Sequence, residues 1–390
     1  MVTLQRFASL WLVLASVLSF SRTTSASPLF GPSYHPVVIW HGLGDSAYSE
    51  GMQSFAQSLK DAFPGIFVHL AHVGDDLSSD QKAGFFGDLS KQLPLICKQI
   101  EDVPELEDGF DAIGFSQGGL FMRAYVERCQ NAPPVRNLVT FGSPQNGISD
   151  LPACTGLLCR LAEGALRGGV YTDYAQTNVV SAQFYRDPRS ETGYPAYLEH
   201  NRFLQDINNE VSINKDYKKQ IISLESLVLL QFSQDKTIVP KESSWFGAYP
   251  LYNQTESETA DEPKAQPIPL KQTALYTQDR LGLKTLDKRG ALVLDVCKGQ
   301  HMQIDVACQQ KVFGTYIGTP ASFRLLPRPI RNAWAYSLYN TTGLRAASMP
   351  PALNLLLFLT AITLIRTVYL LGTFARASYQ KRQEGQIRLA

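Results

Sequence analysis

The sequence predicts an α/β fold with a mostly parallel sheet, because short apolar runs alternate with stretches of helical spacing. Runs with the length and composition of buried strands lie at residues 36–40, 66–70, 110–115 and 135–141. Helices are expected at residues 46–63, 89–100 and 120–129. In such a chain each helix carries the backbone back to the edge where the next strand begins, so the strands pair in parallel.

The alternation breaks after the fourth run. Residues 145–223 are rich in aromatic and polar residues but hold no strand-like run, so we expect a mostly helical insertion over the top of the sheet. The strand pattern returns at residues 226–232 and 291–294, and a polar surface loop is expected between them at 256–266.

The composition is that of a globular protein with one large domain or two ordinary ones. The chain has 390 residues, of which 44% are hydrophobic and 18% are charged, and its net charge is +1. This balance excludes an intrinsically disordered chain. The nearly neutral charge gives no electrostatic support to a nucleic-acid partner.

The first 26 residues are predicted to be a secretory signal peptide. Arg6 supplies the positive charge, residues 10–20 form an apolar run too short to span a bilayer comfortably, and residues 24–26 are small enough for cleavage. An N-terminal membrane anchor is the alternative. A signal peptide directs the chain, with a folded domain expected at residues 27–330, into the secretory pathway.

The C-terminal end carries a possible membrane-anchoring helix. After a linker at residues 331–351, residues 352–375 are apolar with one charge, Arg366, and a basic tail follows at 376–390. The length suits a single membrane span and the basic tail suits a cytoplasmic end. An arginine near mid-span costs about 2.5–3.5 kcal/mol on insertion, so an amphipathic surface helix is the alternative.

Cysteines and glycosylation sequons also fit an exported chain. An even number of cysteines favours disulfides over free buried thiols, although six cysteines allow fifteen pairings. The six are Cys97, Cys129, Cys154, Cys159, Cys297 and Cys308. Sequons in polar stretches make Asn253 and Asn340 candidate glycosylation sites.

Residues 114–118 read Gly-Phe-Ser-Gln-Gly, which is the G-x-S-x-G pattern of a nucleophile elbow. Glycines avoid side-chain clashes in this sharp turn, which lifts the serine hydroxyl above the carboxyl edge of the sheet. The apolar strand before the turn and the helix after it are the context that the mechanism requires. The motif therefore predicts an α/β-hydrolase fold in which Ser116 is a nucleophile and not an ordinary turn serine.

The serine needs a general base, and in this fold the histidine follows both the serine and the acid in the chain. That order excludes the four histidines before Ser116. His301 follows the last predicted strand by a short loop, where the base is expected, whereas His200 lies inside the insertion. A disulfide between Cys297 and Cys308, which bracket His301, would fix this loop.

Asp235 is the predicted acid that orients the histidine, because it follows the strand at 226–232, one strand before the histidine strand. An ordinary turn or capping aspartate is the alternative reading of Asp235. The rival acids are Asp150, which opens the insertion, Asp206, and Asp295, which lies on the histidine's own strand.

Two backbone N–H groups are expected to hold the oxyanion. Gln117 begins the helix after the elbow and aims its N–H at the developing charge. The loop at residues 41–44 ends the first strand and in this fold donates the second N–H, for which we choose Leu43. His41 in this loop is expected to make a structural hydrogen bond to the backbone. Chemistry of this kind needs no metal and no cofactor.

Together the motifs resemble those of the palmitoyl-protein thioesterase family, from about residue 36 to residue 314. The segments that carry the resemblance are VIWHGLGDS at 38–46, IGFSQGGL at 113–120, FGSPQNG at 141–147, WFG at 245–247 and YTQDRLGL at 276–283. Two features depart from the family. Its mammalian members have adjacent cysteines where this chain has residues 46–48, and Cys297 and Cys308 look like an addition.

The resemblance implies the same catalytic and oxyanion residues as the motifs. It also implies disulfides Cys97–Cys129 and Cys154–Cys159, and an insertion that builds a groove for a long acyl chain with Ile238 and Val239 in it. The activity implied is removal of palmitoyl groups from S-acylated cysteines of proteins, in the lysosome or vacuole, with secretion open. A lipase or carboxylesterase acting on oxygen esters is the alternative, and an idle lipid-binding module is a third reading.

Overall fold

Six parallel strands form one sheet in the computed structural model, which describes residues 34–151, 156–166, 169–189, 191–252 and 266–319. The strands pair in the order β2-β1-β3-β4-β5-β6. Their bounds are β1 (Val37–Trp40), β2 (Val68–Ala71), β3 (Phe110–Phe115), β4 (Val135–Phe141), β5 (Ser226–Phe232) and β6 (Leu292–Cys297). The predicted α/β fold with a parallel sheet is confirmed.

The strand order contains a topological switch at β1. The chain adds β2 on one side of β1 and then β3 on the other side, so crossovers run in opposite directions from this strand. In open α/β sheets, ligands bind outside the carboxyl ends of the strands at such a point. The loop at residues 41–44 follows β1 there, and Ser116 follows β3.

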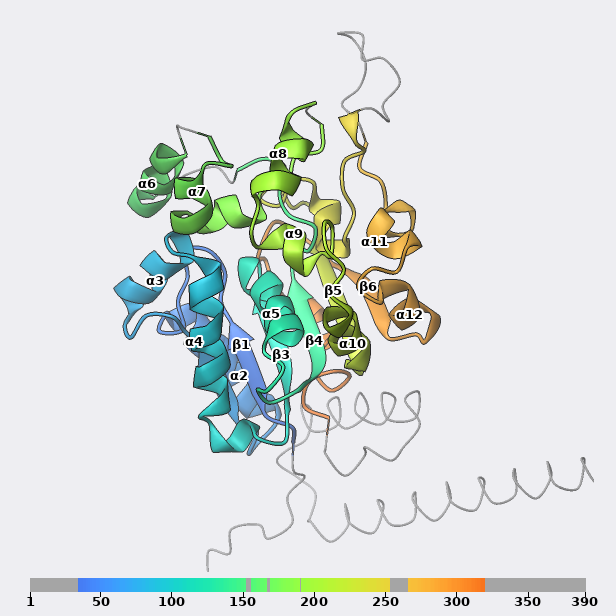
Figure 1. The fold of residues 1–390 in the computed structure, drawn as a ribbon. Helices are drawn as coiled ribbons and strands as arrows, with labels where there is room; N and C mark the ends of the chain where they lie inside the picture. Colours follow the sequence, from blue (N-terminus) through green and yellow to red (C-terminus); the bar gives the residue numbers. More distant parts are fainter. Residues whose placement is uncertain (1–33, 152–155, 167–168, 190, 253–265, 320–390) are drawn as a thin grey trace, which may run out of the picture.

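Helices cover both faces of the sheet because its side chains alternate between two apolar cores (Figure 1). In β3, Ala112 belongs to one core and Ile113 to the other. The first core includes α4 (Leu89–Glu101), α5 (Gln117–Arg128), α10 (Lys215–Ser223), α11 (Ala274–Thr277) and α12 (Leu283–Lys288). The second includes α2 (Glu50–Ala62) and α13 (Val306–Gln310).

Short helices lie above the carboxyl ends of the strands (Figure 1). They are α6 (Leu157–Ala165), α7 (Asp173–Asn178), α8 (Gly193–His200) and α9 (Leu204–Ile207). The buried side chain of Arg123 on α5 holds this layer, donating to the Ile207 carbonyl at 3.0 Å and the Asn208 amide oxygen at 2.9 Å. Within the expected insertion, α10 packs beside α5 against the sheet and not above it.

The predicted and observed elements differ mainly at sheet edges and in polar helices. The edge strands β2 and β6 begin and end one to three residues later than the apolar runs indicate. The helix α3 (Leu77–Phe85) was not predicted, because its sequence LSSDQKAGF has little apolar periodicity; an Asp76 capping box begins it. Single 3₁₀ turns are η1 (Pro104–Leu106), η2 (Val180–Phe184), η3 (Lys241–Trp245) and η5 (Leu270–Gln272).

Several sequence-based expectations fall outside the described residues. They concern the signal peptide at 1–26, the linker, the apolar segment at 352–375, the basic tail, Cys154, Asn253 and Asn340. Among the helices that are described, none is both long and apolar enough to cross a membrane.

Two disulfides lie within the described residues. Cys97 on α4 and Cys129 at the end of α5 are joined, with their Cα atoms 5.7 Å apart. Cys297 at the end of β6 and Cys308 on α13 are joined across 5.2 Å. Cys159 is also disulfide-bonded.

Replacing Cys97 and Cys129 together by serine is expected to lower the free energy of unfolding by roughly 3–4 kcal/mol, because the disulfide closes a loop across a sequence separation of 32 residues in the unfolded chain. Urea denaturation followed by circular dichroism measures the change. A midpoint equal to that of the wild type, at an equal slope, would contradict the prediction.

Candidate active site

Ser116 occupies a strained turn between β3 and α5. Its backbone has φ 51° and ψ −126°, in the left-handed half of conformational space that non-glycine residues rarely adopt. The Ser116 N–H donates to the Phe141 carbonyl of β4 at 2.8 Å, which fixes the turn to the sheet. A side chain at Gly114 is excluded, because its Cβ would lie 2.2 Å from the Gly119 Cα. This is the nucleophile elbow that the motif predicts.

The structure brings Ser116, His301 and Asp235 into one hydrogen-bonded chain. The Oγ of Ser116 lies 3.0 Å from Nε2 of His301, and Nδ1 of His301 lies 2.7 Å from Oδ2 of Asp235. The Asp235 side chain is completely buried and that of His301 is 15% exposed. Because Nδ1 donates to the carboxylate, Nε2 is left to accept the serine proton.

Backbone contacts hold the acid and the base in place. Oδ1 of Asp235 accepts from the N–H groups of Thr237 and Ile238 at 2.9 and 3.0 Å, so its other oxygen points at His301. The loops of β5 and β6 are joined where Gln234 donates to the Gly299 carbonyl at 2.9 Å. The Cys297–Cys308 disulfide closes the loop that presents His301.

The alternative candidates for the base and the acid make contacts away from the catalytic chain. His200 ends α8, where it is half exposed and lies 3.8 Å from Glu199. Each rival acid forms an ion pair away from His301. These pairs are Asp150 with Arg189, Asp206 with Arg128, and Asp295 with Lys311.

The two residues chosen as oxyanion donors both lie beside Ser116. Gln117 is the first residue of α5, so its N–H has no acceptor within the helix. The loop of Leu43 passes so close to the nucleophile that a Cβ on Gly42 would lie 3.0 Å from the Ser116 Cβ. Leu43, Ser116 and Gln117 line the same cavity, as does His301.

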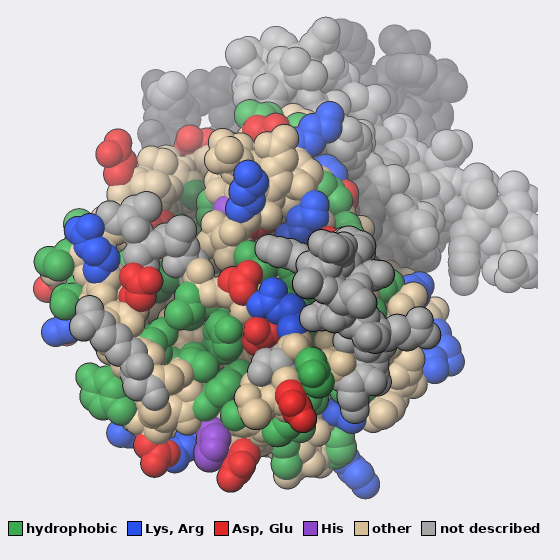
Figure 2. Space-filling view, turned by 90° about the horizontal axis from the view of Figure 1, so that it is seen from above, with side chains coloured by type: hydrophobic (Ala, Val, Ile, Leu, Met, Phe, Trp, Pro, Cys, Tyr) green, Lys and Arg blue, Asp and Glu red, His purple; other side chains and the backbone are tan. Residues whose placement is uncertain are grey.

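That cavity has a volume of about 710 Å³ and is mainly apolar. Figure 2, which views the molecule from above, shows hydrophobic side chains gathered around a hollow in this face. Lining side chains that the sequence analysis did not identify include Met52, Phe85, Leu158, Phe184 and Met302. They come from five separate segments, so no local pattern marks them.

Of the two residues expected in the acyl groove, only one lines the cavity. Ile238 lines the cavity. Val239 is not among the lining residues, which corrects the expectation, and its carbonyl accepts the Ser149 N–H at 2.6 Å. The Ile238 N–H donates to Oδ1 of Asp235 at 3.0 Å, so this segment bends beside the acid and brings only one of the pair to the cavity.

Asp235→Asn is expected to slow covalent labelling of Ser116 by a fluorophosphonate probe by roughly 10²-fold or more, because an amide does not orient and stabilise the imidazolium as a carboxylate does. Mass spectrometry of the labelled peptide over time measures the rate. Asp295→Asn is the matched control, since Asp295 pairs with Lys311 on the surface, and should label like the wild type. Equal slowing in both variants would contradict this assignment of the acid.

The family model and two relatives that match this sequence carry the same family name. A model of the family described as palmitoyl protein thioesterase matches residues 36–301. Palmitoyl-protein thioesterase 1 of Caenorhabditis elegans is 37% identical over 272 residues, covering 69% of this chain and 87% of that protein. Palmitoyl-protein thioesterase 3 of Dictyostelium discoideum is 32% identical over 258 residues, covering 66% and 81%.

A more distant group of relatives has a related name. Lysosomal thioesterase PPT2 of Rattus norvegicus is 30% identical over 298 residues, covering 74% of this chain and 89% of that protein. The matched family region begins one residue before β1 and ends at His301, so it contains Ser116, Asp235 and His301. The chain belongs to the palmitoyl protein thioesterase family.

Proposed function

We propose that this protein is a serine thioesterase that removes palmitoyl groups from S-acylated cysteines of proteins. The observation that carries the proposal is the hydrogen-bonded chain of Ser116, His301 and Asp235 beside an apolar cavity of about 710 Å³. A cavity of this size, largely apolar with Ser116 and His301 in its lining, suits a long acyl chain with its reactive carbonyl at the serine. The names of the relatives favour the same substrate.

In the first half of the reaction, His301 Nε2 takes the proton of Ser116 as Oγ attacks the thioester carbonyl carbon. The carbonyl oxygen becomes an oxyanion, and the N–H groups of Leu43 and Gln117 donate to it. The carbon–sulfur bond then breaks. The cysteine thiol leaves with the proton held by His301, and the acyl group stays on Ser116 as an oxygen ester.

In the second half, water attacks the acyl-serine. His301 removes a proton from the water and returns one to the Ser116 Oγ as the ester bond breaks, which releases the fatty acid. Asp235 stays ionised throughout and stabilises the imidazolium each time it forms. The buried Asp235 oxygens each have a partner, so the acid is held in one orientation.

The alternative is hydrolysis of oxygen esters, which would use the same residues. The test is hydrolysis of a palmitoyl thioester beside its oxygen-ester analogue, by the wild type and by Ser116→Ala. We expect thioester turnover to dominate and to fall by at least 10³-fold in the variant. Dominant ester turnover would favour a lipase or carboxylesterase, and unchanged turnover in Ser116→Ala would exclude Ser116 as the nucleophile.

Narrowing the cavity should change the preferred acyl length. Leu158 lines the cavity from α6, so Leu158→Trp would exclude the distal methylenes of a palmitoyl chain. Each buried methylene contributes about 0.8 kcal/mol to binding. If two methylenes of the palmitoyl chain are excluded from the cavity, the ratio of kcat/KM for the palmitoyl thioester to that for the octanoyl thioester should fall roughly tenfold.

The matched control for this change is Leu161→Trp. Leu161 lies on the same helix but is 54% exposed. The acyl-length ratio of this variant should equal that of the wild type. A ratio unchanged in Leu158→Trp as well would mean that the acyl chain does not pass α6.

We also propose that the enzyme acts in the lysosome or another compartment of the secretory pathway. The predicted signal peptide, the disulfides and the lysosomal names of some relatives support this location. Anchoring by residues 352–375 stays a prediction from sequence. Extraction of cell membranes with alkaline carbonate tests it, because a membrane-spanning chain stays in the pellet and a peripheral one is released.

A further inference from the structure

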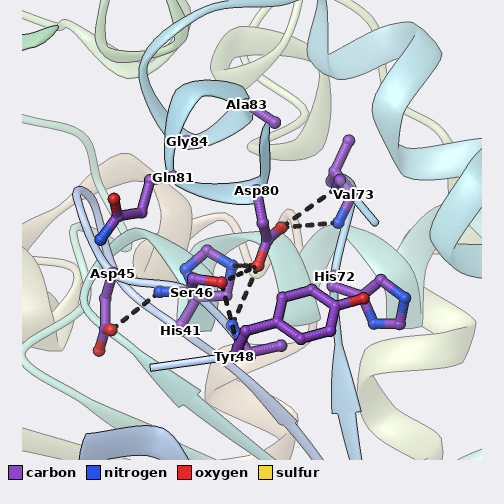
Figure 3. Close-up of polar contacts among 12 residues, drawn as sticks. His41, Asp45, Ser46, Tyr48, His72, Val73, Asp80, Gln81, Ala83 and Gly84 are labelled. Carbon is purple, nitrogen blue, oxygen red and sulfur yellow. Dashed lines mark hydrogen bonds and ion pairs between the residues drawn. The ribbon is translucent and has the colours of Figure 1, made fainter. Parts of the chain in front are cut away.

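The helix α3 lies beside the loop of Leu43 and carries one completely buried acid, Asp80 (Figure 3). The catalytic chain does not use this residue. Its side chain instead points at the segment between β1 and α2, which contains Leu43. A buried carboxylate needs a full set of donors, so the identity of those donors shows what Asp80 holds in place.

Asp80 receives its donors from two loops. Oδ2 accepts from the Ser46 hydroxyl at 2.8 Å and the Ala47 N–H at 3.0 Å, and it lies 3.1 Å from Nε2 of His41. Oδ1 accepts from the N–H groups of Val73 and Gly74 at 2.9 and 3.3 Å. The carboxylate therefore joins both ends of the Leu43 loop to the segment after β2.

Among the partners of Asp80, His41 belongs to the loop that passes close to Ser116. Its Nδ1 lies 2.9 Å from the Gly42 carbonyl, so the predicted contact with the loop backbone is present. Its Nε2 faces Oδ2 of Asp80, so the ring spans from the loop backbone to the buried acid. Although burial opposes it, the hydrogen bond and charge of His41 and the N–H of Val73 hold the pKa of Asp80 far below its ordinary value.

α3 also contacts the second oxyanion residue. The side-chain amide of Gln117 donates to the Gly84 carbonyl at the end of α3, at 3.2 Å. One turn earlier, Gln81 donates to the Gly44 carbonyl at 3.2 Å. A single helix thus contacts the loop of Leu43 and the start of α5, which are the two sides of the oxyanion site.

We propose that Asp80 is a positioning residue that, through His41, Ser46 and Ala47, holds the Leu43 N–H at the distance from Ser116 that the oxyanion requires. The inference rests on the proposed function, because it takes Leu43 as an oxyanion donor. Oxyanion donors act by being held in place before the charge develops. A short loop with glycines at 42 and 44 has little rigidity of its own, whereas a buried carboxylate with four hydrogen-bond donors and His41 at 3.1 Å can fix it.

The test is Asp80→Asn, studied with the full-length enzyme. Palmityl trifluoromethyl ketone reports on the oxyanion site, because Ser116 adds to its carbonyl and leaves a charged oxygen there. Palmitate binding reports on the cavity alone. We expect kcat/KM for a palmitoyl thioester and affinity for the ketone to fall together by roughly 10- to 100-fold, less than the 10²–10³ for removing a donor outright. Palmitate affinity should stay within twofold.

Asp76→Ala is the matched control, because Asp76 caps α3 and does not touch the Leu43 loop. It should lower the melting temperature by a few degrees and leave ketone affinity unchanged. If Asp80→Asn does not fold, Ser46→Ala removes one donor to Asp80 and should give a smaller loss of ketone affinity in the same direction.

Two outcomes would overturn the proposal. One is a ketone affinity in both Asp80→Asn and Ser46→Ala that equals the wild type. The other is an equal loss in Asp76→Ala, which would mean that any loosening of α3 has this effect. Failure of the proposed function is distinguishable, since it would appear in the earlier test as dominant oxygen-ester turnover by the wild type or as unchanged turnover in Ser116→Ala.

Discussion

The hydrogen-bonded chain from Ser116 through His301 to Asp235 is the contact on which the site depends, and it requires three loops to meet at one edge of the sheet. Ser116 and His301 are 185 residues apart in sequence, but the Oγ and Nε2 atoms are 3.0 Å apart. Parallel pairing makes this possible, because the carboxyl ends of β3, β5 and β6 all point to the same edge. The topological switch beside β1 leaves room there for the Leu43 loop.

The strained backbone of Ser116 is held by the elements around it. Its positive φ is compatible with a folded chain only because the N–H is bonded to β4 and the glycines of the elbow allow α5 to pack against β3. The same packing places Gln117, the first residue of α5, in the lining of the cavity. The short helices above the sheet then enclose an apolar space, and buried Arg123 ties that layer to α5. Ser116, Gln117 and the layer that encloses the apolar cavity thus share α5 as their common support.

The helix α3 links these parts from the opposite side. Its apolar end supplies Phe85 to the cavity, its last turn contacts Gln117, and its buried acid holds the Leu43 loop. A polar helix suits such contacts, because hydrogen bonds keep their atoms within narrow ranges of distance and angle.

The sequence by itself determined the parallel sheet, the elbow and the assignment of Ser116, Asp235 and His301, because each depends on a local pattern or on order along the chain. Apolar runs mark buried strands, and Asp235 and His301 each follow such a run. The tertiary structure alone decided the cavity lining, the exclusion of Val239 from it, and the contacts of Asp80. Those features join residues such as Ser46 and Asp80, 34 positions apart, on elements whose sequences carry no mark of their partners. Such contacts arise from the packing of whole elements, which local periodicity does not encode.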